Sequence, residues 1–327
     1  MVMSFEIAFP QTIEDAVSAN ENGARWFAGG TDLIPEIKSD LVHTTRLVNL
    51  KRVQELRGIH TTSDGVRIGA LTTLTEIAEH EGIRANYRAL AQACELAASP
   101  QIRNVATIGG NLNQDSRCAY YRSRFDCFLR GGDKCFMREG ENREAAVIGY
   151  HDCVHVHPSD PANALVAFDA QIVVQGREGE RVIAAQEFFR APDANDTRMN
   201  VLRADELIAA IVLPRVGENT LSVYLKAMDR AAWAFALVSV CARIEMQETR
   251  IENVRVVLGG VAPMPWREFR VEEKLLGAEW NENLVTQGEF EVLEDAQPLA
   301  HNAYKVRLAR GLVKRAVHEC LEIGKDE

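Results

Sequence analysis

The sequence lacks long apolar stretches, an excess of basic residues and the common nucleotide-binding signatures. Its longest apolar stretch, residues 231–242, is interrupted by Ser239 and is shorter than the roughly 18 residues that a membrane-spanning helix needs, so we predict no membrane span. With 37 basic and 47 acidic residues, the chain has a formal net charge of −10, which disfavours nucleic acid as a partner. Neither G-x-G-x-x-G nor G-x-x-x-x-G-K-[ST] occurs, so a Rossmann site and a P-loop lack support.

Two further absences bear on compartment and chemistry. The segment Met1–Glu6 has no basic region followed by an apolar stretch, so we predict a reducing, cytoplasmic compartment. Export together with a signal-bearing partner subunit stays open, which leaves the periplasm as the alternative. No histidine is tied by sequence to a serine or cysteine nucleophile. We therefore expect no catalytic residue in this chain, and a redox relay is favoured.

The length and the alternation of short strands and helices predict an α+β protein with two domains. A turn-rich break at residues 214–218 separates a first domain, 1–216, from a second domain, 217–327. In the second domain we expect three strands with helices packed on one face. The expected strands are 220–226, 235–246 and 251–257, and the expected helices are 267–276, 280–287 and 303–323.

Four of the seven cysteines gather in a segment that has no periodicity, residues 114–157, which we interpret as an insertion loop. These cysteines are Cys118, Cys127, Cys135 and Cys153. Four thiolates can hold an iron-sulfur cluster, and the close C-x₂₋₄-C pair typical of structural zinc is absent. His151, His155 and His157 flank Cys153, however, and keep a zinc-stabilised binding module without redox activity open. The other three, Cys94, Cys241 and Cys320, have apolar neighbours that predict buried packing.

The cysteine segment is also locally basic in an acidic chain. Between residues 117 and 138 it contains Arg117, Arg122, Arg124, Arg130, Lys134 and Arg138, against Asp126 and Asp133. Such charge would offset that of four thiolates and a cluster, and a solvated basic loop is the alternative.

Paired glycines occur in two similar segments, residues 28–33 and 107–112. In each, the glycines let backbone amides approach a ligand closely, and a hydroxyl group and an Asp or Asn stand beside them. Two such segments in one domain favour a dinucleotide over a mononucleotide, although each alone could be a simple turn. We expect the first segment to lead from a strand through a tight turn into a helix capped at Thr31-Asp32.

Four segments of the chain resemble those of a known family. The segments FAGGTDLIPEIK (27–38), ATIGGNL (106–112), HPSDPANAL (157–165) and LGGVAPMPWR (258–267) resemble the FAD-binding medium subunit of molybdenum hydroxylases, the xanthine dehydrogenase and carbon monoxide dehydrogenase superfamily. The resemblance covers essentially the whole chain. It implies a two-lobed FAD-binding domain, followed by a smaller three-stranded α/β C-terminal domain. The cysteine loop looks like an insertion of 4-hydroxybenzoyl-CoA reductase and bacterial aldehyde oxidoreductase flavin subunits, which carries an additional 4Fe-4S cluster.

The resemblance also implies residue roles. The first FAD loop, which wraps the diphosphate, matches Phe27, Ala28, Gly29, Gly30, Thr31, Asp32 and Leu33, and the second matches Thr107, Gly110 and Asn111. Asp160 matches an acid that contacts the cofactor, Ile208 an apolar residue against the flavin ring, and Lys226 a lysine near it. The cluster ligands match Cys118, Cys127, Cys135 and Cys153. The spacing before Cys127 and Cys153 departs from that of the reductase, which leaves a nearby histidine open as the fourth ligand.

The family further implies partners. A large molybdopterin subunit would oxidise the substrate, and a small subunit with two 2Fe-2S clusters would pass electrons to FAD in this chain and on to a soluble acceptor. The segment 229–242 resembles the aldehyde oxidoreductase branch more than the other branches. The alternatives are a 4-hydroxybenzoyl-CoA reductase, in which electrons run from a soluble donor toward the substrate, and a xanthine dehydrogenase-like enzyme.

Overall fold

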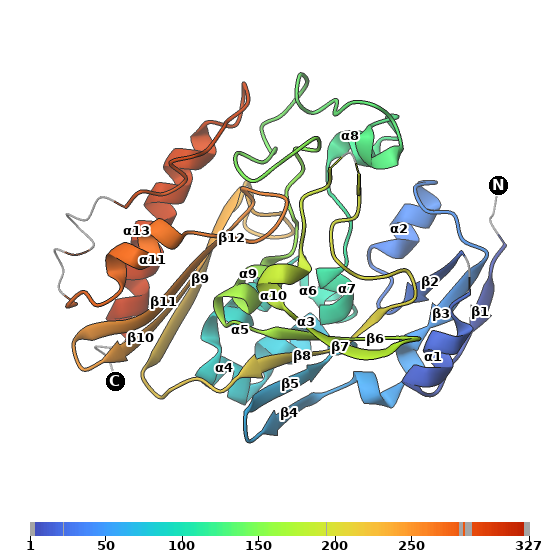
Figure 1. The fold of residues 1–327 in the computed structure, drawn as a ribbon, viewed down its shortest axis with the longest axis horizontal. Helices are drawn as coiled ribbons and strands as arrows, with labels where there is room; N and C mark the ends of the chain where they lie inside the picture. The colour runs from blue at the N-terminus through green and yellow to red at the C-terminus, as the bar shows by residue number, and fades with distance from the viewer. Residues whose placement is uncertain (1–3, 22, 194, 281–283, 285–289, 324–327) are drawn as a thin grey trace.

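The computed structural model describes residues 4–21, 23–193, 195–280, 284 and 290–323 (Figure 1). Within them the chain forms three β-sheets with helices packed between and outside them. Two of the sheets come from the part before Pro214, and the third comes from the part after it.

A small parallel sheet opens the chain. Its strand order is β1-β3-β2, with β1 at Glu6–Ala8, β2 at Ala24–Phe27 and β3 at Arg46–Asn49. Helix α1 (Ile13–Ala19) begins after Thr12, whose hydroxyl accepts a hydrogen bond from the backbone N of Asp15 at 3.1 Å. Helix α2 (Leu33–Lys38) follows the first glycine segment. The predicted passage from strand through glycine turn to helix is therefore confirmed.

The second sheet is antiparallel, with strand order β4-β5-β8-β6-β7. Its strands are β4 Ile59–Thr62, β5 Gly65–Gly69, β6 Gln171–Gly176, β7 Gly179–Ala184 and β8 Leu207–Pro214. Successive side chains on a strand point to opposite faces, so this sheet has two cores. Ile172 packs with the helices, whereas Val173 packs with β3 and α1.

Most of the helices of the first part pack against this second sheet. They are α3 Leu74–Glu79, α4 Glu81–Asn86, α5 Arg88–Glu95, α6 Pro100–Arg103, α7 Ile108–Leu112, α9 Asp160–Ala167 and α10 Ala185–Phe188. The cysteine segment 114–157 contains only α8 (Ala119–Arg122) and a 3₁₀ turn at Phe128–Arg130, and α8 lies at the top of Figure 1. Its lack of periodicity therefore reflects an irregular loop, as predicted.

The C-terminal sheet has one strand more than the three predicted. Its order is β12-β11-β10-β9, with β9 Thr220–Ala227, β10 Val238–Gln247, β11 Arg250–Gly259 and β12 Trp266–Arg267. The extra strand, β12, pairs only two residues with β11, too few to give a period in the sequence. Helices α11 (Phe269–Leu275) and α13 (Tyr304–Ile323) cover one face. The predicted helix 280–287 lies almost entirely outside the described residues.

The other face of the C-terminal sheet is buried against the first part of the chain. Along β10, Val240 and Ala242 belong to the core beneath α13, whereas Cys241 between them joins the core of α5 and α9. Cys94, Cys241 and Cys320 are each 0% exposed, which confirms their prediction as packing residues. The sheet thus has helices on both faces, α11 and α13 on one and helices of the first part on the other.

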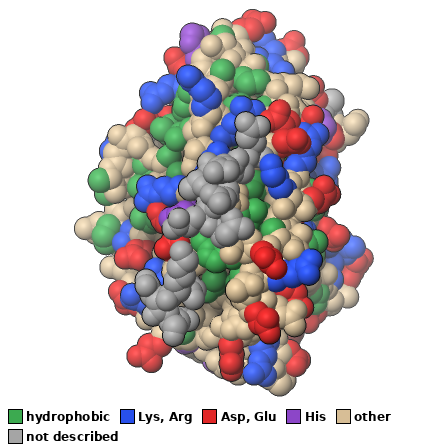
Figure 2. Space-filling model, turned by 90° about the vertical axis from the view of Figure 1, so that its left-hand side faces the viewer, with side chains coloured by type: hydrophobic (Ala, Val, Ile, Leu, Met, Phe, Trp, Pro, Cys, Tyr) green, Lys and Arg blue, Asp and Glu red, His purple; other side chains and the backbone are tan. Residues whose placement is uncertain are grey.

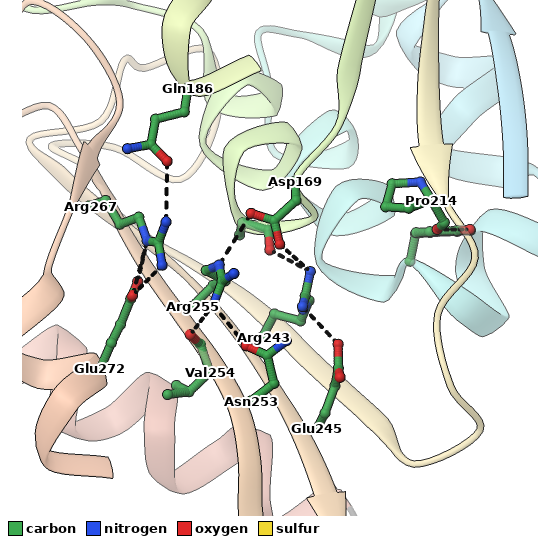
Figure 3. A network of polar contacts seen from close by, with 12 residues as sticks. Asp169, Gln186, Pro214, Arg243, Glu245, Asn253, Val254, Arg255, Arg267 and Glu272 are labelled. Atoms are coloured by element: carbon green, nitrogen blue, oxygen red, sulfur yellow. Dashed lines mark hydrogen bonds and ion pairs between the residues drawn. The ribbon is translucent and has the colours of Figure 1, made fainter. Parts of the chain in front are cut away.

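Polar contacts reinforce this junction (Figure 3). Asp169, just after α9, accepts from Arg243 Nη1 at 3.1 Å and from Arg255 Nε at 3.2 Å. On the same junction Arg267 bonds both Glu272 and Gln186. The two parts of the chain are therefore joined by arginines of the C-terminal sheet that reach acceptors in the first part.

The outer face near α11 and α13 is shown in Figure 2, where acidic and basic side chains are interspersed. Ion pairs such as Arg310 with Glu294 (2.8 Å) and Arg315 with Glu319 (2.6 Å) account for part of this mixture. Among the described helices, none is long and apolar enough to cross a membrane.

Candidate functional site

A cavity of about 910 Å³ lies where the glycine segments, the cysteine loop and the C-terminal sheet meet. This volume is at the upper end of the range found for small-molecule sites, so the cavity can take a ligand as large as a dinucleotide. Its lining combines Thr31 and Asp32 of the first glycine segment, Gly110 and Asn111 of the second, and Asp160 of α9.

The two glycine segments lie against each other. Gly30 has a φ of +74°, which permits the tight turn before α2. A Cβ atom at Gly29 would collide with the backbone carbonyl of Val105, shortly before the second segment. A glycine at this position therefore lets the two segments approach closely enough to frame one ligand.

Asp32 does not cap α2 as expected. Its side chain makes no hydrogen bond to the helix N-terminus, because the carboxylate is engaged elsewhere. Asp32 Oδ1 pairs with Arg117 at 2.7 Å and with Arg122 at 3.0 Å, and Oδ2 accepts from the backbone N of Asp115 at 2.9 Å. The first glycine segment is thus fastened to the start of the cysteine loop.

The second glycine segment is the short helix α7 and not an open loop. The Thr107 hydroxyl caps it by accepting from the backbone N of Gly110 at 3.3 Å, so this amide already has a partner. Asn111 Oδ1 accepts from Ser159 Oγ at 2.6 Å, and Ser159 in turn caps α9. The segment therefore orders the start of α9 as well as lining the cavity.

Asp160 has fixed partners on both carboxylate oxygens. Oδ1 accepts from the Tyr224 hydroxyl at 2.6 Å, and Oδ2 accepts from Lys226 Nζ at 2.7 Å. Lys226 also donates to the carbonyl of Leu96 at 3.0 Å. Burial raises the pKa of Asp160, and the Lys226 ammonium acts in the opposite direction. Burial also raises the pKa of Tyr224 well above its usual value, so the phenol stays a donor.

The sequence-predicted cofactor residues fall into two groups around the cavity. Thr31, Asp32, Gly110, Asn111 and Asp160 line it. The others are not among the residues that line it: Phe27, Ala28, Gly29, Gly30, Leu33, Thr107, Ile208 and Lys226. Ile208 is 4% exposed within β8, and the side chain of Lys226 is 0% exposed.

A loop that was not predicted to belong to the site also lines the cavity. Residues 229–237, between β9 and β10, contribute Arg230, Trp233 and Phe235. Arg230 donates to the Trp233 carbonyl at 2.7 Å, and the Arg117 guanidinium lies 5.2 Å from the Phe235 ring centroid. The aromatic residues Trp233 and Phe235 are the feature of the sequence that could have indicated a ligand-binding role for this loop.

The four clustered cysteines form no disulfide and lie near one another. Cys118 is close enough to Cys127 and Cys135 for their charges to interact, and Cys135 lies beside Cys153. The neighbouring Cys153 thiol lowers the pKa of Cys135 to about 6. Cys118 also lines the large cavity. Of the four thiols, Cys118 therefore borders the ligand cavity.

Two of the histidines near Cys153 place Nδ1 against the backbone, whereas the buried Nε2 of His155, a residue that lines the cavity, has no hydrogen-bond partner. His155 Nδ1 lies 3.2 Å from the carbonyl of Val156, and His157 Nδ1 accepts from the backbone N of Ser159 at 3.3 Å. Burial lowers the pKa of His155 to about 4 and that of His157 to about 3. In the part of the chain that the structure describes, no group of three or more His, Cys, Asp or Glu side chains is arranged to hold a metal ion.

The basic residues of the loop do not act together. Arg117 and Arg122 turn inward, where Arg117 pairs with Asp32 and Arg122 with both Asp32 and Glu36. Arg138 bonds the backbone carbonyls of His151 and Asp152, within the loop itself. Arg117 and Arg122 therefore balance buried carboxylates.

Comparison with known proteins gives the same outline. The family described as FAD binding domain in molybdopterin dehydrogenase matches residues 3–216, and the CO dehydrogenase flavoprotein C-terminal domain matches residues 223–320. The aldehyde oxidoreductase FAD-binding subunit PaoB of Escherichia coli is 36% identical over 305 residues, which cover 91% of this chain and 92% of that one. The carbon monoxide dehydrogenase medium chain of Hydrogenophaga pseudoflava is 27% identical over 323 residues, which cover 96% of each.

The fold matches solved structures as well. Carbon monoxide dehydrogenase from Hydrogenophaga pseudoflava, in a form that lacks the Mo-pyranopterin moiety, superposes with a TM-score of 0.77 at 23% identity. The match covers 98% of this chain and 99% of the other. Quinoline 2-oxidoreductase from Pseudomonas putida superposes with a TM-score of 0.71 at 18% identity, covering 98% of each chain.

Proposed function

Because this chain belongs to the FAD-binding subunits of the molybdenum hydroxylase family, we propose that it is the electron-transferring FAD and 4Fe-4S subunit of a heterotrimeric, molybdenum-containing aldehyde oxidoreductase. The chain is an FAD-binding oxidoreductase subunit. The observation that carries the finer proposal is that Cys118, one of four neighbouring thiols, lines the cavity framed by the two glycine segments. We propose a division into an FAD-binding domain, 1–216, and a flavoprotein C-terminal domain, 217–327.

The cavity suits FAD through its glycine segments and its size. We propose that the cofactor is held by the residues assigned to it above: Phe27, Ala28, Gly29, Gly30, Thr31, Asp32, Leu33, Thr107, Gly110, Asn111, Asp160, Ile208 and Lys226. Within this set, the chain itself fastens Asp32 with two arginines and Asp160 with Tyr224 and Lys226. Side chains held in this way need little reordering when the cofactor binds.

We propose that Cys118, Cys127, Cys135 and Cys153 hold a 4Fe-4S cluster. Four cysteine thiols are the usual ligand set of such a cluster, and each ligates a different iron atom, so they are spaced more widely than the ligands of one ion. The Cys153 thiol lies beside that of Cys135, which supports Cys153 as the fourth ligand. When bound, FAD and the cluster supply the electron transfer, while the protein fixes their positions and surroundings.

The partners follow from the relatives. Several of these are named as subunits or medium chains of dehydrogenases, including the carbon monoxide and glyceraldehyde dehydrogenase medium chains. We propose a large molybdopterin subunit, a small subunit with 2Fe-2S clusters and a soluble electron acceptor. The aldehyde as substrate class is supported by the 36% identity to an aldehyde oxidoreductase subunit. A cytoplasmic location is part of the proposal, and fractionation of cells that express the tagged chain tests it.

Anaerobic purification of the complex, followed by absorption spectroscopy and by flavin, iron and zinc analysis, tests the cofactors. We expect one FAD and about four iron atoms for each copy of this chain, beyond the iron of the small subunit. The Cys135→Ser variant should lose this iron and keep the flavin, whereas Cys320→Ser, which changes a buried packing cysteine, should keep both. FAD without additional iron would overturn the cluster, and zinc in its place would favour a metal-stabilised module.

Turnover tests the substrate class. The purified complex should reduce an artificial acceptor with aldehydes and should not turn over with 4-hydroxybenzoyl-CoA or xanthine. Activity with the aromatic thioester or with xanthine, and none with aldehydes, would overturn the assignment to an aldehyde.

A further inference from the structure

Four polar side chains form a buried polar chain at the wall of the cavity. Asn163 Nδ2 donates to Ser239 Oγ at 3.3 Å, and Tyr224 donates to Asp160 Oδ1 at 2.6 Å. Ser239 lies close enough to the Tyr224 phenol to act on its pKa, which links the two pairs. All four are at most 5% exposed. Asp160, Asn163 and Ser239 line the cavity, whereas Tyr224 lies behind them.

The hydrogen bonds of this polar chain run toward Asp160. A carboxylate can only accept, so the Tyr224 hydroxyl must point toward Asp160, and Ser239 accepts from the Asn163 amide at the other end. Hydrogen bonds in series polarise one another, and the last one, from a phenol to a buried carboxylate, is charge-assisted. Lys226 supplies the opposite charge at Oδ2, so Tyr224 supplies the donor that Oδ1 needs.

The chain of polar side chains crosses the junction between the two parts of the protein. Asp160 and Asn163 are on α9, whereas Tyr224 is on β9 and Ser239 is on β10. Ser239 pairs with Gly259 of β11, and a Cβ atom at Gly259 would collide with both Asn163 and Ser239. The glycine therefore leaves the space that this contact needs, as expected of a built arrangement.

We propose that Tyr224 is a positioning residue of the flavin site, which acts through Asp160 on FAD affinity and on the midpoint potential of the flavin. The proposal rests on the proposed contact between Asp160 and FAD. Tyr224 touches neither the cavity nor the cofactor, and it holds the carboxylate in place while withdrawing part of its charge.

The Tyr224→Phe substitution removes one hydroxyl and keeps the ring. Asp160 Oδ1 then loses its donor, and a buried carboxylate without one turns toward the nearest solvated space, which here is the cavity. More negative charge beside the flavin opposes the addition of electrons. We therefore expect the midpoint potential to become more negative and FAD to bind about tenfold more weakly.

The experiment compares the wild-type complex with Tyr224→Phe, Ser239→Ala and Tyr87→Phe. FAD dissociation constants come from flavin fluorescence, and midpoint potentials come from anaerobic spectroelectrochemistry. Tyr87 is the matched control because it is 2% exposed, bonds the carbonyl of Pro214 at 2.8 Å and does not line the cavity. Ser239→Ala breaks the chain one bond further from Asp160 and should shift both quantities in the same direction by less.

The outcomes separate this inference from the proposed function. If Tyr224→Phe and Tyr87→Phe leave the potential and the FAD affinity equally unchanged while Asp160→Asn alters them, the positioning role of Tyr224 is wrong and the Asp160 contact stands. If Asp160→Asn also changes neither, the contact itself is wrong. A wild-type complex without flavin would instead overturn the proposed function.

Discussion

Glu36, on α2, is a buried carboxyl group among charged neighbours. It is 4% exposed, and it lies near Asp32 and Asp115 as well as near Arg122, which pairs with both Glu36 and Asp32. Burial, followed by the charges of Asp115 and Asp32, raises the pKa of Glu36 to about 8. Glu36 is therefore mostly protonated at neutral pH.

This pKa gives a pH dependence of stability. The folded-state pKa of about 8 lies above the usual value of about 4.5, so the stabilising contribution is complete below about pH 4.5 and is lost as pH rises through 8. Glu36→Gln imitates the protonated form, so its melting temperature should match that of the wild type at about pH 4 and exceed it at about pH 9. Thermal unfolding at both pH values measures this difference, with Glu14→Gln, on the exposed side of α1, as the control. An equal difference at both pH values would contradict the assignment.

Among the elements, α13 has a role beyond covering the C-terminal sheet, because its first turn anchors the cysteine loop. Lys305 Nζ donates to the carbonyls of Glu144 (2.9 Å), Ala145 (3.0 Å) and Gly260 (2.7 Å). Just before the helix, Asn302 Nδ2 donates to the carbonyls of Ala145 and Ala146 at 3.1 Å each. Burial lowers the pKa of Lys305 to about 7. Side chains at the start of a regular helix thus supply the hydrogen-bond donors that the backbone carbonyls of the irregular loop need.

The Lys305→Met variant keeps the length of the side chain and removes these donors. It should lower the free energy of unfolding by about 3 kcal/mol, because buried carbonyls lose their partners. Since the loop carries the proposed cluster ligands, the variant should also retain less iron while FAD is retained. Urea unfolding and iron analysis measure the two effects, and Lys314→Met on the same helix is the matched control. Unchanged iron content would show that the loop holds its shape without this anchor.

At the scale of the whole molecule, the cavity and the hydrogen-bond chain both depend on the fit between the two parts of the protein. Asp169 contributes to that fit by accepting from Arg243 and Arg255, which come from neighbouring strands. It has a φ of +52°, a conformation that asparagine tolerates better than most residues. The side chain of Arg243 is 5% exposed, whereas that of Asp169 is 41% exposed, so solvent screens part of the attraction.

Asp169→Asn removes the charge and keeps the backbone preference. We expect a loss of about 1 kcal/mol in the free energy of unfolding, together with faster proteolysis between β8 and β9. Urea titration and limited proteolysis measure these effects. Glu319→Gln breaks an ion pair on the exposed side of α13 and should change the free energy of unfolding by less than about 0.5 kcal/mol. Similar losses in both variants would mean that Asp169 is no more than a surface charge.

Local features of this protein could be predicted from the sequence because they depend on neighbouring residues. Thr12 caps α1 three residues before Asp15, and the apolar surroundings of Cys94, Cys241 and Cys320 indicated burial. The irregular loop between 114 and 157 was visible as a loss of periodicity. The fourth strand of the C-terminal sheet, β12, was not predicted because it is too short to show a period.

Partners between distant segments were decided by the tertiary structure alone. Asp32 reads as a helix cap from its neighbours, yet Arg117 and Arg122 claim its carboxylate, and Tyr224 meets Asp160 only because β9 packs beside α9. Turn formation is settled within a few residues, so the sequence by itself determines the glycine turns. A buried charge takes whichever partner the packing of strands and helices brings within reach, and that choice exists only in the folded chain.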